Sequence, residues 1–237
     1  MNPVIEKKHL RYLAQSAWTK PFRKFLYKRL PKDKPVSMLE VGCGTGVLVD
    51  CVKDEFRGKI NLIAGVDLDR CVLDYAKDKT CFIAVQADGM KLPFSNESFE
   101  FVFCHYLLLW TYSPERVITE MKRVTKTGGL CAVMAEPDYG ELEAKPESLT
   151  RLAQEQVMAL ERQGAKLNNG HCLGELFRSV GFQNCQAGCY QRGLVNRDFL
   201  AQEISQMIED CGIQSFKIDE KVDYIYHVPT YYAYAVK

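Results

Sequence analysis

The chain has 237 residues, of which 47% are hydrophobic and 26% charged, and its net charge at pH 7 is +1. This composition is ordinary for a soluble globular protein, and the length allows one domain with a sizeable core. No apolar run approaches the roughly 18 residues of a membrane span, and residues 1–10 lack the apolar stretch of a signal peptide. We therefore expect a cytoplasmic enzyme or binding protein without a membrane partner.

The first 35 residues form a basic segment. They hold ten Lys and Arg against Glu6 and Asp33, so the remaining 202 residues sum to a charge of −7. Residues 9–30 have a helical pattern that breaks near Pro21, with aromatic and leucine side chains between the charges. We interpret residues 1–35 as a solvated N-terminal helical cap, and the alternative is a surface for an anionic partner such as nucleic acid.

Residues 36–137 predict an alternation of strands and helices. Near-continuous hydrophobic runs, typical of a parallel sheet with both faces covered, alternate with segments of helical period. The predicted strands are 37–42, 61–69, 80–88, 98–110 and 129–137, and the predicted helices are 46–56, 69–79 and 113–129. Asp69 and Ser113 stand where N-caps are expected. The alternation predicts an open, doubly wound, Rossmann-like α/β sheet.

The pattern changes after residue 140. The expected helices are 146–164, 174–182 and 196–212, and the expected strands are 182–191 and 228–237. With the five earlier strands these predict a seven-stranded, mostly parallel sheet. We expect residues 36–237 to form one globular unit, in which residues 140–237 supply the substrate cap and the last strands.

The stretch "MLEVGCGTGVLVD", residues 38–50, places Gly42, Gly44 and Gly46 directly after the first predicted strand. Ligands of open α/β sheets bind at the carboxyl ends of strands. Glycine permits the positive φ angles of a tight turn and lets a ligand touch the backbone. The alternative is a strand–helix turn that binds nothing.

Two acidic residues follow the glycines at regular intervals. Asp67 ends the second predicted strand, 21 residues after Gly46, and Asp88 ends the third, a further 21 residues on. A carboxylate at the end of the second strand reaches ribose hydroxyls in nucleotide-binding folds. Each acid alone could be a helix N-cap, but together they favour a nucleoside ligand without phosphate. The glycine fingerprint of dinucleotide-binding folds needs a small residue at the position of Val47. The valine therefore makes a dinucleotide ligand such as NAD less favoured.

The motifs "EVGCGTG", "GVDLD", "QADGMKLPFSNESFEFVFCHYLLLW" and "PERVITEMKRVTKTGG" resemble those of class I S-adenosylmethionine-dependent methyltransferases. The resemblance covers residues 36–137 and is strongest to the small-molecule, methyltransferase type 11/25-like branch. It implies S-adenosyl-L-methionine as cofactor and S-adenosyl-L-homocysteine as product. The implied cofactor-binding residues are Glu40, Gly42, Cys43, Gly44, Gly46, Asp67, Leu68, Asp88, Gly89 and Cys104.

The same resemblance implies a role for each group of these residues. The glycines would form the loop under the methionine part of the cofactor, and Glu40 would orient that loop or the cofactor's ammonium. Asp67 would bond the ribose hydroxyls, and Leu68 would pack on the adenine. Asp88 would accept from the adenine amino group, with Gly89 beside it.

Methyl transfer from a sulfonium is an in-line displacement that needs positioning more than a fixed catalytic dyad. Cys104 and His105 end the fourth predicted strand and would face the sulfonium. His105 is a weak candidate for a general base, the alternative being a hydrogen-bonded residue at a strand end. Tyr139, with Asp138, could touch the acceptor or form a turn, and His171 is expected to precede a helix. Candidate residues for the acceptor pocket or for packing are Tyr12, Trp18, Trp110 and Tyr112.

The expected function is methyl transfer to a small molecule, and two alternatives stay open. One is an RNA or protein methyltransferase that uses the basic N-terminus, although no "NPPY" or "DPPY" follows the fourth strand and we do not expect a nucleic-acid partner. The other is a non-catalytic cofactor-binding protein. The ten cysteines predict free thiols in a reducing compartment, and we expect no metal site. A monomer and a homodimer both remain open.

Overall fold

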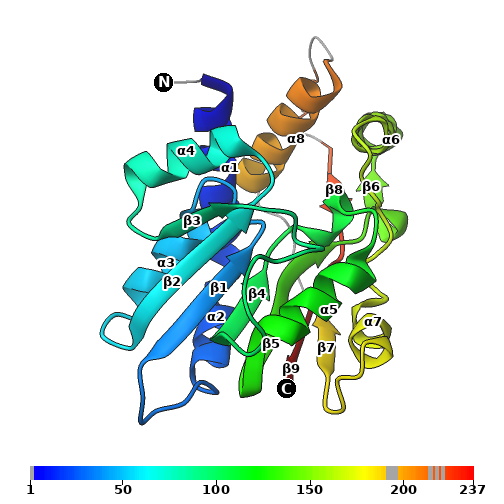
Figure 1. Ribbon diagram of the computed structural model, residues 1–237. Helices are drawn as coiled ribbons and strands as arrows, with labels where there is room; N and C mark the ends of the chain where they lie inside the picture. Colours follow the sequence, from blue (N-terminus) through cyan, green and yellow to red (C-terminus); the bar gives the residue numbers. More distant parts are fainter. Residues whose placement is uncertain (1–2, 191–196, 213–215, 217–218, 220–221) are drawn as a thin grey trace.

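The computed structural model describes residues 3–190, 197–212, 216, 219 and 222–237. At its centre lies a seven-stranded sheet with the strand order β3-β2-β1-β4-β5-β9-β7 (Figure 1). The strands are β1 Val36–Val41, β2 Ile60–Asp67, β3 Ile83–Gln86, β4 Phe99–Cys104, β5 Thr125–Pro137, β7 Gln186–Cys189 and β9 Thr230–Val236. Strands β1 to β5 pair in parallel, whereas β9 is antiparallel to β5 and β7. The predicted Rossmann-like, mostly parallel sheet is confirmed.

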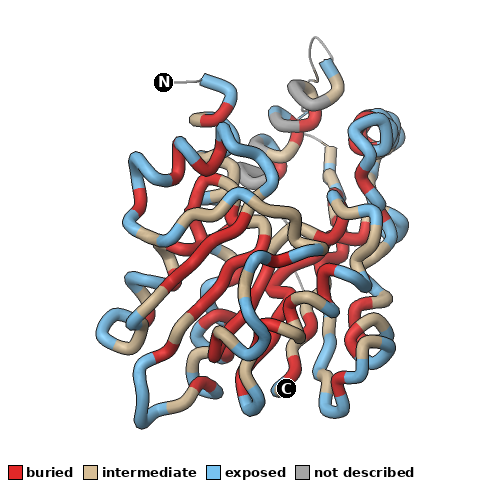
Figure 2. The backbone as a smooth tube through the Cα atoms, viewed as in Figure 1, coloured by how far each residue is buried: buried red, intermediate tan, exposed pale blue. Residues whose placement is uncertain are grey.

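Helices cover both faces of this sheet. Those packed on it are α2 Lys20–Tyr27, α3 Val47–Glu55, α4 Arg70–Lys79, α5 Pro114–Val124 and α7 Leu173–Ser179. Successive residues of a strand face opposite sides. Leu39 and Val41 therefore join the core under α5 and α7, while Met38 joins the core under α2 and α3. The inner strands, among them β1, β4 and β5, form the buried centre of the molecule in Figure 2, whereas the edge strands β3 and β7 are largely exposed.

The basic N-terminal segment forms two helices, α1 Pro3–Trp18 and α2. The break lies at Thr19 rather than at Pro21, because a proline fits the first turn of a helix. Arg23 is buried, and it donates to the Ser16 carbonyl and to the Thr19 hydroxyl at 2.7 Å each. Its guanidinium also donates to both carboxylate oxygens of Glu55 in α3, at 3.0 and 2.7 Å. This bidentate pair, of which Arg23 is buried and Glu55 partly buried, fastens the cap to the sheet domain.

The structure corrects the bounds of several predicted elements, among them the strand predicted at 182–191, which is shortened to Gln186–Cys189. The fourth strand ends at Cys104, and Leu108–Trp110 form a 3-10 turn, η1, instead of continuing the strand. Tyr106, with a φ of 53°, reverses the chain direction there. The third strand is shortened to Ile83–Gln86, and the helix expected to reach residue 129 ends at Val124.

A small second sheet, which the sequence pattern did not reveal, lies beside the main one. Its antiparallel strands are β6 Glu143–Lys145 and β8 Ile225–His227. They pack with α6 Glu147–Arg162 and α8 Arg197–Cys211 around a separate hydrophobic cluster. None of the helices in the described part of the chain has the length and apolarity that crossing a bilayer requires.

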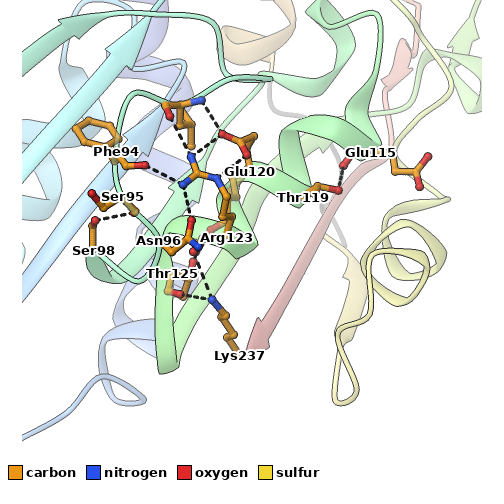
Figure 3. A network of polar contacts seen from close by, with 12 residues as sticks. Phe94, Ser95, Asn96, Ser98, Glu115, Thr119, Glu120, Arg123, Thr125 and Lys237 are labelled. Carbon is orange, nitrogen blue, oxygen red and sulfur yellow. Dashed lines mark hydrogen bonds and ion pairs between the residues drawn. The ribbon is translucent and has the colours of Figure 1, made fainter.

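One arginine fastens the loop between β3 and β4 to α5 (Figure 3). Arg123 pairs with Glu120 of the same helix at 2.7 Å, and it donates to the carbonyl oxygens of Leu92 and Phe94 at 3.0 and 2.8 Å. Glu120 in turn accepts from the Leu92 amide at 2.8 Å. Because this loop follows Asp88, the network helps to fix one edge of the predicted site.

Candidate functional site

A cavity of about 910 Å³ lies at the carboxyl ends of β1, β2 and β4. Most residues of the implied cofactor site line it, namely Glu40, Gly42, Cys43, Gly44, Asp67, Leu68, Asp88 and Gly89. The cavity is also lined by His105, Tyr139, Tyr12, Trp110 and Tyr112, the candidates for contact with an acceptor. The fold thus gathers residues from Val4 to Gln163, which are 159 positions apart in the chain, into one hollow.

The glycine turn brings backbone amides to the cavity wall. The amides of Gly42 and Cys43 both donate to the Val66 carbonyl, at 2.7 and 2.9 Å. Gly42 and Gly44 have φ angles of 75° and 50°, which favour glycine. A Cβ on Gly44 would lie 3.0 Å from the Tyr12 ring of α1, so the cap closes tightly over this turn.

Gly46 has a different position from the other two glycines. Its φ is 79°, it caps the start of α3, and it does not line the cavity. A Cβ there would lie 3.3 Å from the Phe82 ring and 3.4 Å from the Ala76 side chain. Gly46 therefore serves the turn and the packing of α4, which corrects the implied contact with a cofactor.

The acids at the ends of β2 and β3 are tied into the backbone around the cavity. Asp67 accepts from the Gly44 amide at 2.8 Å and from the Asp69 amide at 3.0 Å, so it links the glycine turn to β2. Asp88 lies two residues past β3 and accepts from the Met90 amide at 2.8 Å. The predicted N-cap is confirmed, because Asp69 accepts from the Cys71 amide at 2.8 Å.

Glu40 is a buried acid on the cavity wall whose Oε2 has no hydrogen-bond partner among the described residues. Burial, and then the charge of Asp67, hold the pKa of Glu40 well above its usual range. A buried oxygen without a partner is unfavourable by about 1–3 kcal/mol. A ligand that brings a hydrogen-bond donor or a positive charge to this end of the cavity would relieve that penalty.

Cys104 does not line the cavity, contrary to the role that the resemblance implies. It is completely buried in the core cluster beneath α5. The reason is the alternation of β4, in which Phe101 and Phe103 face the other layer and Val102 and Cys104 face α5. Burial raises the pKa of the Cys104 thiol well above its ordinary value, which makes the thiol unreactive.

His105 follows β4 and borders the cavity. Its Nε2 atom is buried and has no hydrogen-bond partner in the described part of the chain. Burial lowers the pKa of His105 to about 3, so the imidazole is neutral at physiological pH. Such a group is a poor general base, but it offers a hydrogen bond to a molecule in the cavity.

Buried Glu136, at the end of β5, holds the aromatic wall of the cavity in place. Its two carboxylate oxygens accept from the amides of Leu108 and Leu109, at 3.1 and 2.6 Å, and so fix the η1 turn that carries Trp110. Burial raises the pKa of Glu136 to about 8, and the charge of Asp138 adds to the rise. The only signal for this role was an acid in the apolar run "AVMAEP".

Asp138 is completely buried and does not line the cavity. Its carboxylate accepts from the Gly140 and His171 amides, at 3.1 Å each, and lies 2.7 Å from the His171 Nδ1. Asp138 therefore fixes the turn that presents Tyr139 to the cavity. Trp18 also lies outside the lining, where it packs edge-on against Tyr106 at 6.4 Å between ring centroids.

In the described part of the chain, no group of three His, Cys, Asp or Glu is arranged to hold a metal ion. None of the ten cysteines, all of which lie in the described part of the chain, is joined in a disulfide. The groups that the cavity offers to a ligand are its glycine turn, its carboxylates, its neutral imidazole and its aromatic wall.

Comparison with known proteins identifies the part of the chain that builds most of this cavity. Residues 39–133 match a family model described as a methyltransferase domain. A curated relative, the demethylmenaquinone methyltransferase of Staphylococcus aureus strain MRSA252, is 30% identical over 124 residues, which is 50% of this chain and 51% of the relative. The chain spans about half the length, or less, of the first curated relatives that it matches.

Solved structures share the fold of residues 39–133 and of the segments around them. The phosphoethanolamine N-methyltransferase 2 of Haemonchus contortus, in a complex with S-adenosylhomocysteine, has a TM-score of 0.62 at 18% identity and covers 93% of this chain and 53% of its own. The [4+2]-cyclase SpnF has a TM-score of 0.59 at 18% identity and covers 91% of this chain and 80% of its own. The second example shows that this fold alone does not determine the reaction.

Proposed function

We propose that this chain binds S-adenosyl-L-methionine and transfers its methyl group to a small-molecule acceptor, with release of S-adenosyl-L-homocysteine. The observation that carries the proposal is the cavity at the strand ends of a methyltransferase domain, where the glycine turn and two carboxylates converge. The relative that acts on demethylmenaquinone and the neighbour that binds S-adenosylhomocysteine support the same activity.

The residues of the cavity fit the methionine end of this cofactor. Gly42 and Gly44 line the cavity with backbone, and the Leu107 and Tyr12 side chains pack where a Cβ would lie. An amino-acid chain could therefore lie against the backbone of this turn only because both residues are glycines. The unpartnered oxygen of Glu40 suits an ammonium group, which would also favour ionisation of the buried carboxyl. Cys43, beside Glu40, is buried and completes this wall.

The nucleoside end is assigned to the strand ends of β2 and β3. Asp67, Asp88 and Gly89 line the cavity there. Asp67 would accept from ribose hydroxyls, and Asp88 would accept from the adenine amino group beside Gly89. Leu68 is 69% exposed at the rim of the cavity, and a bound adenine would cover it. These are the residues whose replacement should weaken binding most.

When bound, the cofactor supplies the electrophilic methyl group, and the protein's part is to orient the acceptor. His105, as a neutral imidazole, would hold a hydroxyl or amine of the acceptor by a hydrogen bond rather than remove its proton. Tyr139 and Trp110, both on the cavity wall, would enclose the acceptor and limit its orientations. Alignment of this kind supplies up to about 7–11 kcal/mol of a reaction barrier.

Titration calorimetry with S-adenosylhomocysteine tests this assignment. We expect Asp88→Ala to weaken binding about tenfold to a hundredfold, since a hydrogen bond to a charged group contributes about 1.5–3 kcal/mol. Asp67→Asn is the preferred change at the other acid, because its amide oxygen can still accept from the Gly44 amide. Asp74→Ala is the control, because Asp74 pairs with Arg70 on the exposed face of α4. Binding that is the same in all variants would contradict the site.

An RNA or protein acceptor is the alternative that one observation favours, namely that Lys7, Lys8 and Arg11 of α1 line the cavity. Filter binding of total RNA tests it, because retention that falls steeply with salt would support a nucleic-acid substrate. S-adenosylhomocysteine binding without turnover of any acceptor would instead favour the non-catalytic alternative. A cytoplasmic location, and the choice between monomer and homodimer, remain predictions.

A further inference from the structure

A separate hollow lies at the opposite end of the sheet from the candidate site, where the cap meets the turn between α3 and β2. Its volume is about 610 Å³, and its lining residues, the basic cleft, are Tyr27, Lys28, Lys32, Arg57, Gly58 and Lys59. Four of the six are cations and none is acidic. The strongly basic N-terminus seen in the sequence is therefore joined here by two cations of the sheet domain.

Tight backbone turns hold both walls of the basic cleft. After α2, the Leu30 amide donates to the Tyr27 carbonyl at 3.2 Å. On the other wall, the Lys59 carbonyl accepts from the Val36 amide at 2.8 Å, at the start of β1. Gly58 has a φ of 81°, and a Cβ there would meet no atom within 4 Å, so the turn opens to solvent. The cations are thus held near one another around an accessible hollow.

Little of this positive charge is neutralised by the protein. Arg57 pairs with Asp54 at 3.1 Å, but both side chains are largely exposed, and such pairs contribute at most about 1 kcal/mol. Lys28 and Lys32 form no ion pair within the described residues. Mutual repulsion of clustered cations is unfavourable, and an anion that contacts several of them at once relieves it.

The aromatic residue of the basic cleft restricts the kind of anion. The Tyr27 ring stacks on Phe56, with 4.4 Å between ring centroids and 21° between planes. The ammonium of Lys59 lies over the same ring, 4.5 Å from its centroid. Proteins bind single-stranded nucleic acids by stacking bases on free aromatic faces, and the Tyr27 ring is already occupied. Recognition therefore depends on charge, for which phosphate groups are the best match to Lys and Arg.

We propose that the basic cleft binds a compact polyphosphate anion, either free in solution or as the head group of a phosphorylated lipid. Tyr27, Lys28 and Lys32 belong to the cap, whereas Arg57 and Lys59 belong to the sheet domain. The anion would bridge the two and stabilise their association, since a ligand that binds only the folded state raises its stability. This inference does not depend on the proposed cofactor.

Titration calorimetry with sodium tripolyphosphate tests the proposal. The double variant Lys32→Gln, Arg57→Gln removes one cation from each wall and should weaken binding about tenfold or more. The control, Lys145→Gln with Arg151→Gln, removes the same charge from exposed positions on β6 and α6. A thermal scan of each variant without ligand verifies folding, and tripolyphosphate should raise the melting temperature of the wild type and the control only.

Two further experiments distinguish a lipid head group from a free anion as the source of the phosphate. Flotation with phosphatidylcholine vesicles that contain phosphatidylinositol bisphosphate would assign a lipid head group, if plain vesicles do not bind. Binding of tripolyphosphate alone would assign a free anion. Equal affinity of the two double variants, or no binding of either phosphate probe to the wild type, would overturn the proposal. Retention of transfer RNA without tripolyphosphate binding would overturn it in favour of a nucleic-acid surface.

Discussion

Glu136→Gln should make the stability of this protein less dependent on pH. Glu136 is buried, and its two oxygens accept from the amides of Leu108 and Leu109. Burial raises its pKa from 4.5 to about 8, and the negative charge of Asp138, which itself pairs with His171, adds to the rise. Between these two values the native protein holds a proton that the unfolded chain has released.

The sign and the size of the effect follow from that difference. A pKa raised in the folded state stabilises the protein at low pH, and this contribution is lost as pH rises from about 4.5 to about 8. A shift of this size corresponds to at most about 5 kcal/mol, which is a large part of the total stability of an ordinary domain. Glutamine cannot ionise, so the stability of the Glu136→Gln variant should not fall with pH for this reason. The substitution itself should cost about 1 kcal/mol, because the side-chain NH2 group of glutamine cannot accept from one of the two amides.

Urea unfolding, followed by the fluorescence of the two tryptophans, measures the free energy of unfolding at each pH. We expect the wild type to be slightly more stable than the variant near pH 5, and the variant to equal or exceed it near pH 9. The two curves should therefore cross. Curves that stay parallel from about pH 5 to about pH 9 would refute the reasoning, because Glu136 would then have an ordinary pKa.

Three further substitutions should change stability or cofactor binding. Arg23→Ala should lower the free energy of unfolding by about 1.5–3 kcal/mol, because the buried Ser16 carbonyl and the partly buried Glu55 carboxylate lose their charged donor. A loss below about 1 kcal/mol in urea unfolding would contradict this role. Gly44→Ala should weaken S-adenosylhomocysteine binding in calorimetry, since its Cβ would lie 3.0 Å from a cap aromatic ring, whereas Gly58→Ala should leave it unchanged. His171→Ala should be most destabilising at low pH, because Asp138 raises the pKa of His171 and their ion pair is lost as pH rises. A difference in melting temperature between wild type and variant that does not change with pH would contradict this prediction.

The order of strands and helices over residues 36–137 was predictable because buried parallel strands and amphipathic helices have distinct periods. The glycine turn and Asp67 were predictable for a related reason, since successive parallel strands end at the same edge of the sheet. The sequence did not predict whether a residue at the end of a strand faces the core or the cavity. Cys104 and His105 are neighbours, and only the alternation of β4 decides that the first faces the core while the second borders the cavity.

Other features depend on contacts between distant segments, which local patterns do not encode. Residues 105–110 are as apolar as a strand, but they turn because Glu136, 27 residues away from Leu109, accepts their amides. The basic cleft likewise forms only when the cap is docked, since Lys32 and Arg57 belong to different parts of the chain. The pairing of β6 with β8 joins residues about 80 positions apart and has three residues on each side, too few for a recognisable pattern.

The central claim is that residues 38–50 and the acids that follow form a site for S-adenosylmethionine. Titration of the purified protein with S-adenosylmethionine, S-adenosylhomocysteine and NAD tests it most directly. The account predicts saturable binding of both sulfur nucleosides at one site per chain and no binding of NAD. Binding of NAD alone, or of neither sulfur nucleoside, would contradict it and would leave the glycine turn with a structural role only.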